Sequence, residues 1–198
     1  MKFLLATKQY MTQIFDENGR VHPATVLSAG PVTVTQVKRA DGKDGYGAVQ
    51  VGFGSRREAR VNRAVRPKGL HAHFREFRGE GEYSVGTVLD ASQFNAGDMV
   101  TVSATSKGKG FQGVVKRHGF HGGPRTHGQK HSEREPGSIG SGGVQRVLKG
   151  TRMAGRMGSE RVTVKNLQVL HCNATEHILV VEGAVPGRRG TLVEVRGV

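Results

Sequence analysis

Short apolar segments separated by turn residues fill the first hundred positions of the chain. Runs rich in Val, Leu, Ile and Phe occupy residues 3–7, 10–15, 21–27, 32–38 and 48–53. Between them, segments 16–19 and 41–45 carry the Asp, Asn and Gly residues that are typical of turns joining neighbouring strands. Short strands at this spacing are typical of small barrels or sandwiches. The pattern therefore predicts a β-rich unit.

The pattern changes between residues 56 and 78, where basic residues mix with Ala, Val, Leu and Phe. Pro67 and Gly69 interrupt this segment, which predicts short helices on either side of the proline. Strand patterns return at 83–89, 99–104, 161–172, 177–181 and 191–195, with a turn at 173–176 and a loop at 183–190.

The segment 107–158 separates these later strands and holds very few apolar side chains. It contains fourteen glycines, and between His118 and Gly143 its only sizeable apolar residues are Phe120 and Ile139. Such a segment cannot bury enough surface to offset the entropy lost on ordering its backbone, so in isolation we expect it to be disordered. Because predicted strands precede and follow it and must share one core, the sequence predicts an inserted extension.

Positive charge is concentrated in the same segment. The 198-residue chain has a formal net charge of +14, and residues 107–158 carry eleven Lys or Arg against two acids, an excess of nine. This excess indicates a polyanionic partner such as nucleic acid. No apolar run approaches the roughly 20 residues of a membrane-spanning helix, so we expect no membrane partner. The single cysteine, Cys172, is expected to be a buried, inert thiol in a reducing, cytosolic compartment.

The basic and imidazole side chains of the segment are expected to bind RNA phosphates, riboses and bases. These candidates are Lys107, Lys109, Lys116, Arg117, His118, His121, Arg125, His127, Lys130, His131, Arg134, Arg146, Lys149, Arg152 and Arg156. Glycines are expected where the backbone must come close to the RNA. These candidates are Gly108, Gly110, Gly113, Gly137 and Gly140.

Gly108, Gly110 and Gly113 also spell the GxGxxG pattern of dinucleotide-binding proteins. That site needs a helix that opens at the glycines and presents its N-terminus to a pyrophosphate. The residues that follow Arg117, His-Gly-Phe-His-Gly-Gly-Pro, cannot continue a helix. Close approach of the backbone to phosphates is therefore favoured, and a flexible loop is the remaining alternative.

Other chemistry is less compatible with the segment. His118, His121, His127 and His131 have spacings that suit zinc, but structural zinc sites usually recruit Cys and none is nearby. Neither Ser106 nor Ser132 lies in a strand-to-helix elbow that would present a nucleophile. We therefore expect no metal, no cofactor and no catalytic residue.

Several motifs resemble the bacterial type of the universal large-subunit ribosomal protein L3 family. They are residues 103–113 with Lys116 and Arg117, residues 136–140, 146–158, 160–167 and 183–187, and the opening residues 7–8 and 11–15. The resemblance runs in order along nearly the whole chain. Tyr10 stands where the family usually has glycine and Thr101 where it commonly has an acid, and residues 141–146 lack its usual Thr-Pro-Gly turn.

The resemblance implies a mainly β fold, with a small six-stranded β-barrel of the translation-protein type. It implies a barrel domain at 1–106 and 159–198, with the short helical and basic insert at 56–78 within it. A long, largely non-regular extension would occupy 107–158, with its tip near 137–146.

The implied function is that of a structural constituent of the large ribosomal subunit in the cytoplasm, not of an enzyme. Such a protein binds large-subunit ribosomal RNA near its 3′-terminal domain, supports early assembly and sends its extension toward the peptidyl-transferase centre. Its implied partners are that RNA and neighbouring large-subunit proteins, with no small-molecule substrate. The alternatives are a general nucleic-acid chaperone, or a flavin-type barrel oxidoreductase that uses the GxGxxG motif.

Overall fold

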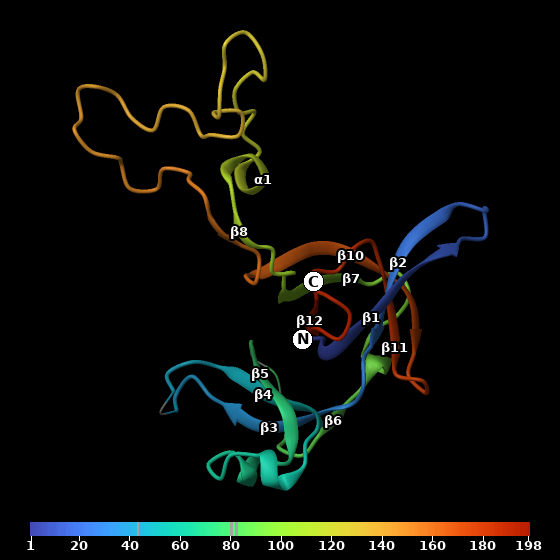
Figure 1. The fold of residues 1–198 in the computed structure, drawn as a ribbon. Helices are drawn as coiled ribbons and strands as arrows, with labels where there is room; N and C mark the ends of the chain where they lie inside the picture. The colour runs from blue at the N-terminus through green and yellow to red at the C-terminus, as the bar shows by residue number, and fades with distance from the viewer. Residues whose placement is uncertain (43, 80, 82) are drawn as a thin grey trace. The chain divides into compact units, whose positions relative to one another are not determined.

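The computed structural model describes residues 1–42, 44–79, 81 and 83–198, and the fold is mainly β (Figure 1). The strands in these residues are β1 (Phe3–Phe15), β2 (Val21–Ser28), β3 (Val32–Lys38), β4 (Ala48–Ser55), β5 (His71–Arg78), β6 (Val88–Leu89), β7 (Met99–Thr105), β8 (Gly110–Gln112), β9 (Gly155–Met157), β10 (Arg161–Asn173), β11 (Ile178–Glu182) and β12 (Leu192–Gly197). The helices are the 3-10 turns η1 (Glu58–Arg60), η2 (Arg66–Lys68) and η3 (Ala91–Gln93), and α1 (Val114–His118).

The chain divides into two compact units. The first comprises Met1–Thr105 and Arg161–Val198, and the second comprises Ser106–Glu160, which we call the arm. The arm is inserted between two neighbouring strands of the first unit, because β7 and β10 are paired with Thr105 opposite Arg161.

Six strands of the first unit form a closed ring of antiparallel neighbours. Their order is β1-β12-β7-β10-β11-β2, and β2 pairs with β1 to complete the ring. The pairing joins the two ends of the chain, since Phe3 of β1 lies opposite Arg196 of β12. Strands from before and after the arm therefore contribute to one structure, and neither set closes the ring alone.

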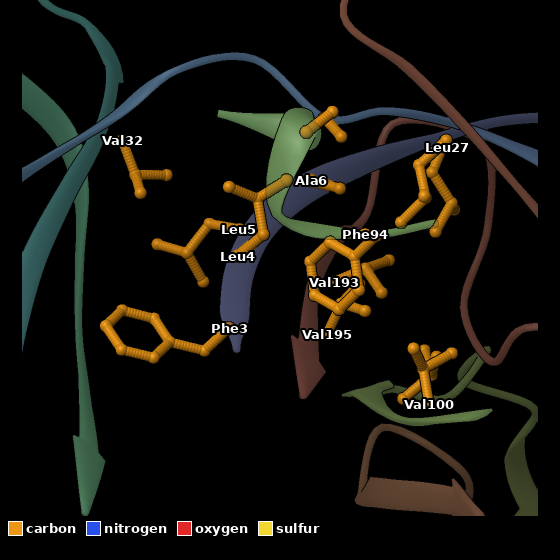
Figure 2. Packing of buried hydrophobic residues seen from close by; sticks show 14 of the residues in the cluster. Phe3, Leu4, Leu5, Ala6, Leu27, Val32, Phe94, Val100, Val193 and Val195 are labelled. Atoms are coloured by element: carbon orange, nitrogen blue, oxygen red, sulfur yellow. The ribbon is translucent and has the colours of Figure 1, made fainter. Parts of the chain in front are cut away.

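A second sheet, with the order β5-β4-β3-β6, shares its hydrophobic core with the ring. Burial alternates along the start of β3, where Val32 and Val34 are buried and Thr33 is half-buried, as expected for a strand with one face in a core. Figure 2 shows part of the cluster, in which side chains of β1 lie between Val32 of the sheet and side chains of the other ring strands. Phe3 stacks on Phe77 of β5 with 4.5 Å between ring centroids. The ring and the four-stranded sheet thus form one packed unit.

Most of the predicted strands are confirmed. Those at 21–27, 32–38, 48–53, 99–104, 161–172, 177–181 and 191–195 have ends within two residues of the observed bounds. The segments 3–7 and 10–15 form the single strand β1, whose register shifts between Lys8 and Tyr10. The predicted turn at 41–45 includes bonds from Gly42 to Arg39 and from Gly45 to Gly42, while Lys43 lies outside the described residues.

Two predictions of secondary structure were wrong in part. The predicted strand at 83–89 is a strand only at Val88–Leu89, because residues 84–87 form a turn. The predicted helical segment 56–78 contains only η1 and η2, and its second half is β5, in which Phe77 is buried opposite Val49. Pairing with β4 outweighs the helical tendency of that mixed sequence.

Cys172 was predicted to be buried, but it is only half-buried. Its Sγ lies 3.0 Å from the carbonyl oxygen of Ala91, to which it donates a hydrogen bond. Burial and the nearby Asp90 carboxylate raise the pKa of the Cys172 thiol above its usual value. The thiol form is therefore favoured at neutral pH, as expected for an unreactive cysteine.

Candidate nucleic-acid interface

The base of the arm is a short two-stranded segment. β8 pairs with β9 in antiparallel register, with Phe111 opposite Arg156. Backbone bonds extend this pairing, because Ser106 N–H donates to the carbonyl of Glu160 at 2.8 Å and Lys109 N–H donates to that of Met157 at 2.9 Å. The outgoing and returning chains are therefore held together over the first residues of the arm.

The helix α1 follows directly and ends after five residues. Gly119 adopts a left-handed conformation with φ 73° and closes the helix by a backbone bond to Val115. The prediction that the residues after Arg117 cannot continue a helix is thus confirmed to within one residue. Of the GxGxxG glycines, Gly108 precedes the antiparallel strand β8, Gly110 begins it and Gly113 is the N-cap of α1. Because β8 pairs, among the described residues, only with the antiparallel β9, this is not the strand-helix-strand unit of dinucleotide-binding proteins.

Two candidate binding residues on α1 also hold the arm together. Arg117 donates from Nη1 to the carbonyl oxygen of Met153 at 2.7 Å, and His118 Nε2 lies 3.0 Å from the same oxygen. The Arg152 guanidinium lies over the ring of Phe120 at 5.0 Å. This structural role was missed in the sequence, because Met153 lies 36 positions beyond Arg117 and no local pattern reports such a contact.

Beyond α1 the arm opens into two loops without regular structure (Figure 1). In the first loop, Gly123 N–H donates to the carbonyl of Glu133 at 3.0 Å, and Arg125 forms an ion pair with the Glu133 carboxylate at 2.8 Å. The predicted tip, 137–146, contains a turn in which Val144 N–H donates to the Ser141 carbonyl at 3.4 Å. In the described part of the arm, the only buried side chain is that of Val114.

Nearly all of the predicted binding side chains are exposed. Arg117 and His118 are half-buried, and the exposed ones are Lys107, Lys109, Lys116, His121, Arg125, His127, Lys130, His131, Arg134, Arg146, Lys149, Arg152 and Arg156. Among the residues that the structure describes, Arg125 is the only one of the eleven cations at 107–158 with an ion pair. The positive charge of the arm is therefore almost entirely without an internal counter-charge.

Four of the five candidate glycines fall into two groups. Gly110 and Gly137 have positive φ values of 68° and 78°, so the backbone itself favours glycine there. Gly113 and Gly140 have ordinary φ values, and a Cβ at either would meet no protein atom closer than 3.8 Å. At Gly113 and Gly140, therefore, the protein itself leaves room for a side chain, and only a binding partner would exclude one. A Cβ at Gly108 would meet the Ser159 hydroxyl oxygen at 2.6 Å.

The four histidines of the arm are dispersed along it. His118 and His121 line a cleft of about 500 Å³ together with Phe120 and Arg152. Within the described residues, no group of three or more His, Cys, Asp or Glu side chains could hold a metal ion. No helix within the same residues is both long and apolar enough to cross a membrane.

Comparison with known proteins identifies the family. Residues 55–178 match the family model of ribosomal protein L3. The large ribosomal subunit protein uL3 of Herpetosiphon aurantiacus is 48% identical over 200 residues, covering 97% of this chain and 94% of that protein. The chain belongs to the ribosomal protein L3 family.

Other members of the L3 family match over similar lengths. The large ribosomal subunit protein uL3 of Acidothermus cellulolyticus is 48% identical over 210 residues, with 99% of this chain and 92% of that protein covered. That of Carboxydothermus hydrogenoformans is 44% identical over 203 residues, with 98% and 96% covered. The family resemblance found in the sequence motifs is thereby confirmed.

Proposed function

We propose that this chain is a structural constituent of the large ribosomal subunit in the cytoplasm, not an enzyme, and that its arm binds large-subunit ribosomal RNA. One observation carries the proposal for the arm. Ten of the eleven cations at 107–158 have no ion pair within the described residues. Val114 is the only described residue of the same segment whose side chain is buried. Charge of this density needs an external polyanion. Membership in the L3 family supports large-subunit ribosomal RNA as that polyanion.

The arm would act by charge neutralisation and close fit. Lys107, Lys109 and Lys116 lie at its base or on α1, where the paired chain holds them in place, and they would neutralise phosphates. Gly113 and Gly140 would let the backbone approach RNA closely, since nothing in the arm itself fills the space beside them. Binding of this kind follows the shape and charge of the RNA backbone.

Base contacts would be concentrated in the cleft beside α1. His118, His121 and Phe120 supply flat rings there, and Arg152 supplies a planar cation. Unstacked RNA bases stack on such groups. The remaining cations and imidazoles, from Arg125 to Arg156, would contact phosphate and ribose.

The finer parts of the proposal rest on the L3 family resemblance. The closed ring of six strands would be the translation-protein-type β-barrel, and the arm would be the extension that reaches toward the peptidyl-transferase centre, with residues 137–146 as its tip. The protein would bind near the 3′-terminal domain of the RNA, early in subunit assembly. Neighbouring large-subunit proteins would be its other partners.

A salt titration tests the mechanism. Binding of the full chain to deproteinised large-subunit RNA should weaken with a log–log slope of about −0.7 to −0.9 per phosphate contact. Replacing Lys107, Lys109, Lys116 and Arg156, which are exposed and form no ion pair in the described structure, by Gln should reduce the slope by about 3, because four contacts are lost. A salt-independent affinity, or a slope that the four substitutions leave unchanged, would refute RNA binding by the arm.

The matched control removes four exposed charges outside the arm. Arg20, Lys165, Arg188 and Arg189 have no side-chain ion pair in the described structure, and their replacement by Gln should leave the slope unchanged. Sedimentation separates the proposal from a general nucleic-acid chaperone. Stable co-migration with large subunits supports a ribosomal constituent, and its absence supports the chaperone.

A further inference from the structure

The positive charge of the chain lies in two segments, and the arm is only one of them. Residues 107–158 hold an excess of nine, and residues 55–70 hold six Lys or Arg against Glu58 alone, an excess of five. The remaining residues of the chain hold thirteen Lys or Arg and thirteen Asp or Glu, so their formal charges cancel. Residues 55–70, which we call the arginine loop, therefore account for all of the net charge that the arm does not carry.

The arginine loop is folded by its own backbone, unlike the outer arm. Arg56 N–H donates to the carbonyl of Leu70 at 2.9 Å and closes the loop at its base. Successive four-residue turns follow, in which the N–H groups of Arg60, Val61, Val65 and Lys68 donate to the carbonyls three positions earlier. The Val61 side chain is buried. The loop therefore presents its charges from a preformed shape next to β4 and β5 (Figure 1).

Four of its arginines are exposed and have no partner. Arg56, Arg57, Arg60 and Arg63 form no side-chain hydrogen bond or ion pair with any residue that the structure describes. The other two cations are engaged: Arg66 lies 3.3 Å from the Glu58 carboxylate, and Lys68 donates to Gln36 and Gln50.

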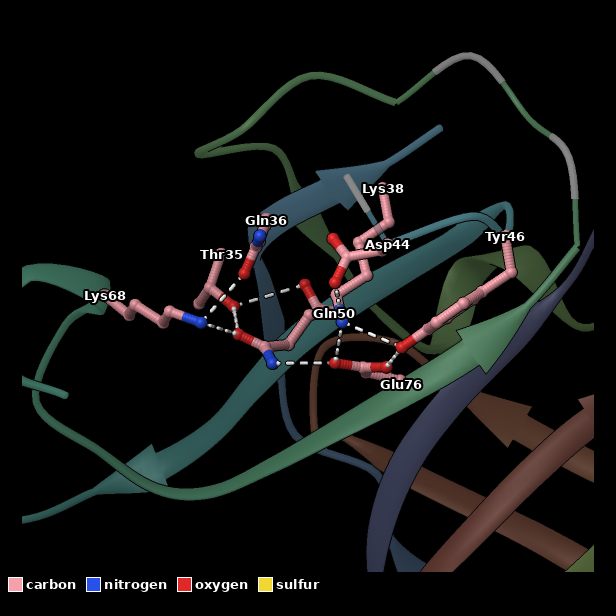
Figure 3. Close-up of polar contacts among 8 residues, drawn as sticks. All are labelled: Thr35, Gln36, Lys38, Asp44, Tyr46, Gln50, Lys68 and Glu76. Atoms are coloured by element: carbon pink, nitrogen blue, oxygen red, sulfur yellow. Dashed lines mark hydrogen bonds and ion pairs between the residues drawn. The ribbon is translucent and has the colours of Figure 1, made fainter. Parts of the chain in front are cut away.

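The sheet beside the loop contains a cation that is paired within the protein. Figure 3 shows Lys38 within a polar network, where its Nζ lies 3.0 Å from Glu76 and 3.4 Å from Asp44. Tyr46 and Glu76 raise the pKa of Lys38 above its usual value. The pKa of His73 in β5 is lowered by burial and by the charges of Arg75 and Arg56. Of these causes, the charge of Arg56 comes from the arginine loop.

We propose that the arginine loop is a second RNA-binding site, which clamps backbone phosphates independently of the arm. The proposal rests on the proposed function. Five of its six cations are Arg, whose planar guanidinium forms two parallel hydrogen bonds with a phosphate. The loop has no aromatic residue on which a base could stack, so it would read phosphates rather than sequence.

An acidic protein fits the loop less well than RNA does. The cores of protein interfaces are enriched in exposed apolar and aromatic side chains. In the arginine loop, Leu70 is the only large hydrophobic residue that is exposed among those described. A surface of four free guanidinium groups with one apolar neighbour suits a repeating anionic backbone.

The first experiment measures the salt dependence of the full chain on deproteinised large-subunit RNA. Replacing Arg56, Arg57, Arg60 and Arg63 by Gln should reduce the log–log slope by about 3, because four phosphate contacts are lost. The circular dichroism spectrum should not change, since none of the four side chains has a partner in the described structure. Combining these substitutions with those at Lys107, Lys109, Lys116 and Arg156 should reduce the slope by about 6.

The outcomes separate this proposal from the proposed function. An unchanged slope for the arginine-loop variant, with a reduced slope for the arm variant, overturns the second site and leaves the arm intact. Unchanged slopes for both variants overturn RNA binding by the arm as well. A reduction no larger than that of the Arg20, Lys165, Arg188 and Arg189 control also overturns the second site.

A photo-crosslinking residue in the loop identifies the class of partner within assembled large subunits. Ala59 and Ala64 are exposed and small, so either can be replaced without removing a contact of the core. A cross-link to RNA is expected at both positions. A cross-link to protein alone overturns the proposal in favour of an acidic protein partner.

Discussion

At the scale of single residues, the pKa values of two histidines in the first unit are shifted in opposite directions. His22 Nδ1 lies 2.8 Å from the Glu182 carboxylate and its Nε2 lies 3.7 Å from that of Asp16. The hydrogen bond with Glu182 raises the pKa of His22 above its usual value. His73 instead lies near Arg75 and Arg56, and its pKa is lowered, chiefly by burial. Two residues with the same ordinary pKa therefore titrate on either side of it.

NMR titration of the imidazole signals should show this separation. We expect the His22 midpoint above about 6.5 and the His73 midpoint below it. Since the folded-state pKa of His22 lies above its unfolded value, its stabilisation is complete below about pH 6.5 and is lost as the pH rises through the folded-state pKa. Glu182→Gln should lower the His22 midpoint and leave that of His73 unchanged. A His22 midpoint at or below 6.5 in the unsubstituted protein would contradict the structure.

At the scale of elements, the sequence predicts strands well where one face is buried by a regular pattern. The segment 32–38 predicts β3 with its observed bounds, because Val32 and Val34 alternate with threonines and mark the core face at its start. It fails for β5, where His and Arg alternate with Ala and Phe and resemble a basic helical segment. It also fails for β8 and β9, since each has three residues and its partner lies more than forty positions away.

In the candidate site too, some features could be predicted from the sequence and others could not. Charge and glycine content predict the arm from composition alone, because neither depends on a distant partner. The contacts of Arg117 and His118 with Met153 could not be predicted, since they depend on how the arm folds back. The unpaired state of the arginine loop also required the structure, which shows that Glu58 contacts only Arg66 among its cations.

Limited proteolysis tests how the arm behaves as an element. With only Val114 buried among its described residues, local opening of the outer arm should require little free energy. Trypsin should therefore cut the RNA-free protein first at Arg125, Lys130, Arg134, Arg146 or Lys149. Deproteinised large-subunit RNA should protect these sites. First cleavage within the ring strands, or equal cleavage with and without RNA, would contradict this expectation.

At the scale of the whole first unit, the residues that form the core differ from those that we propose to bind RNA. The ring and the four-stranded sheet share one apolar cluster, which includes Leu27 and Val193 from the ring and Val51 from the sheet. The four arginines of the arginine loop that are unpaired in the described structure lie outside this cluster and are exposed. Substitutions that abolish charge should therefore spare the fold, and substitutions in the core should affect the ring and the sheet together.

Phe77→Ala tests whether the ring and the sheet unfold as one unit. Phe77 is buried and stacks on Phe3 across their shared core, so its truncation should lower the free energy of unfolding by about 3–5 kcal/mol. Urea unfolding followed by amide exchange at β4 and at β12 should shift to the same lower midpoint, because the two sheets have one core. Val88→Ala, at a side chain that is 60% exposed, should change the free energy by less than about 0.5 kcal/mol. Loss of protection at β4 alone, with β12 unaffected, would show that the sheet unfolds separately from the ring.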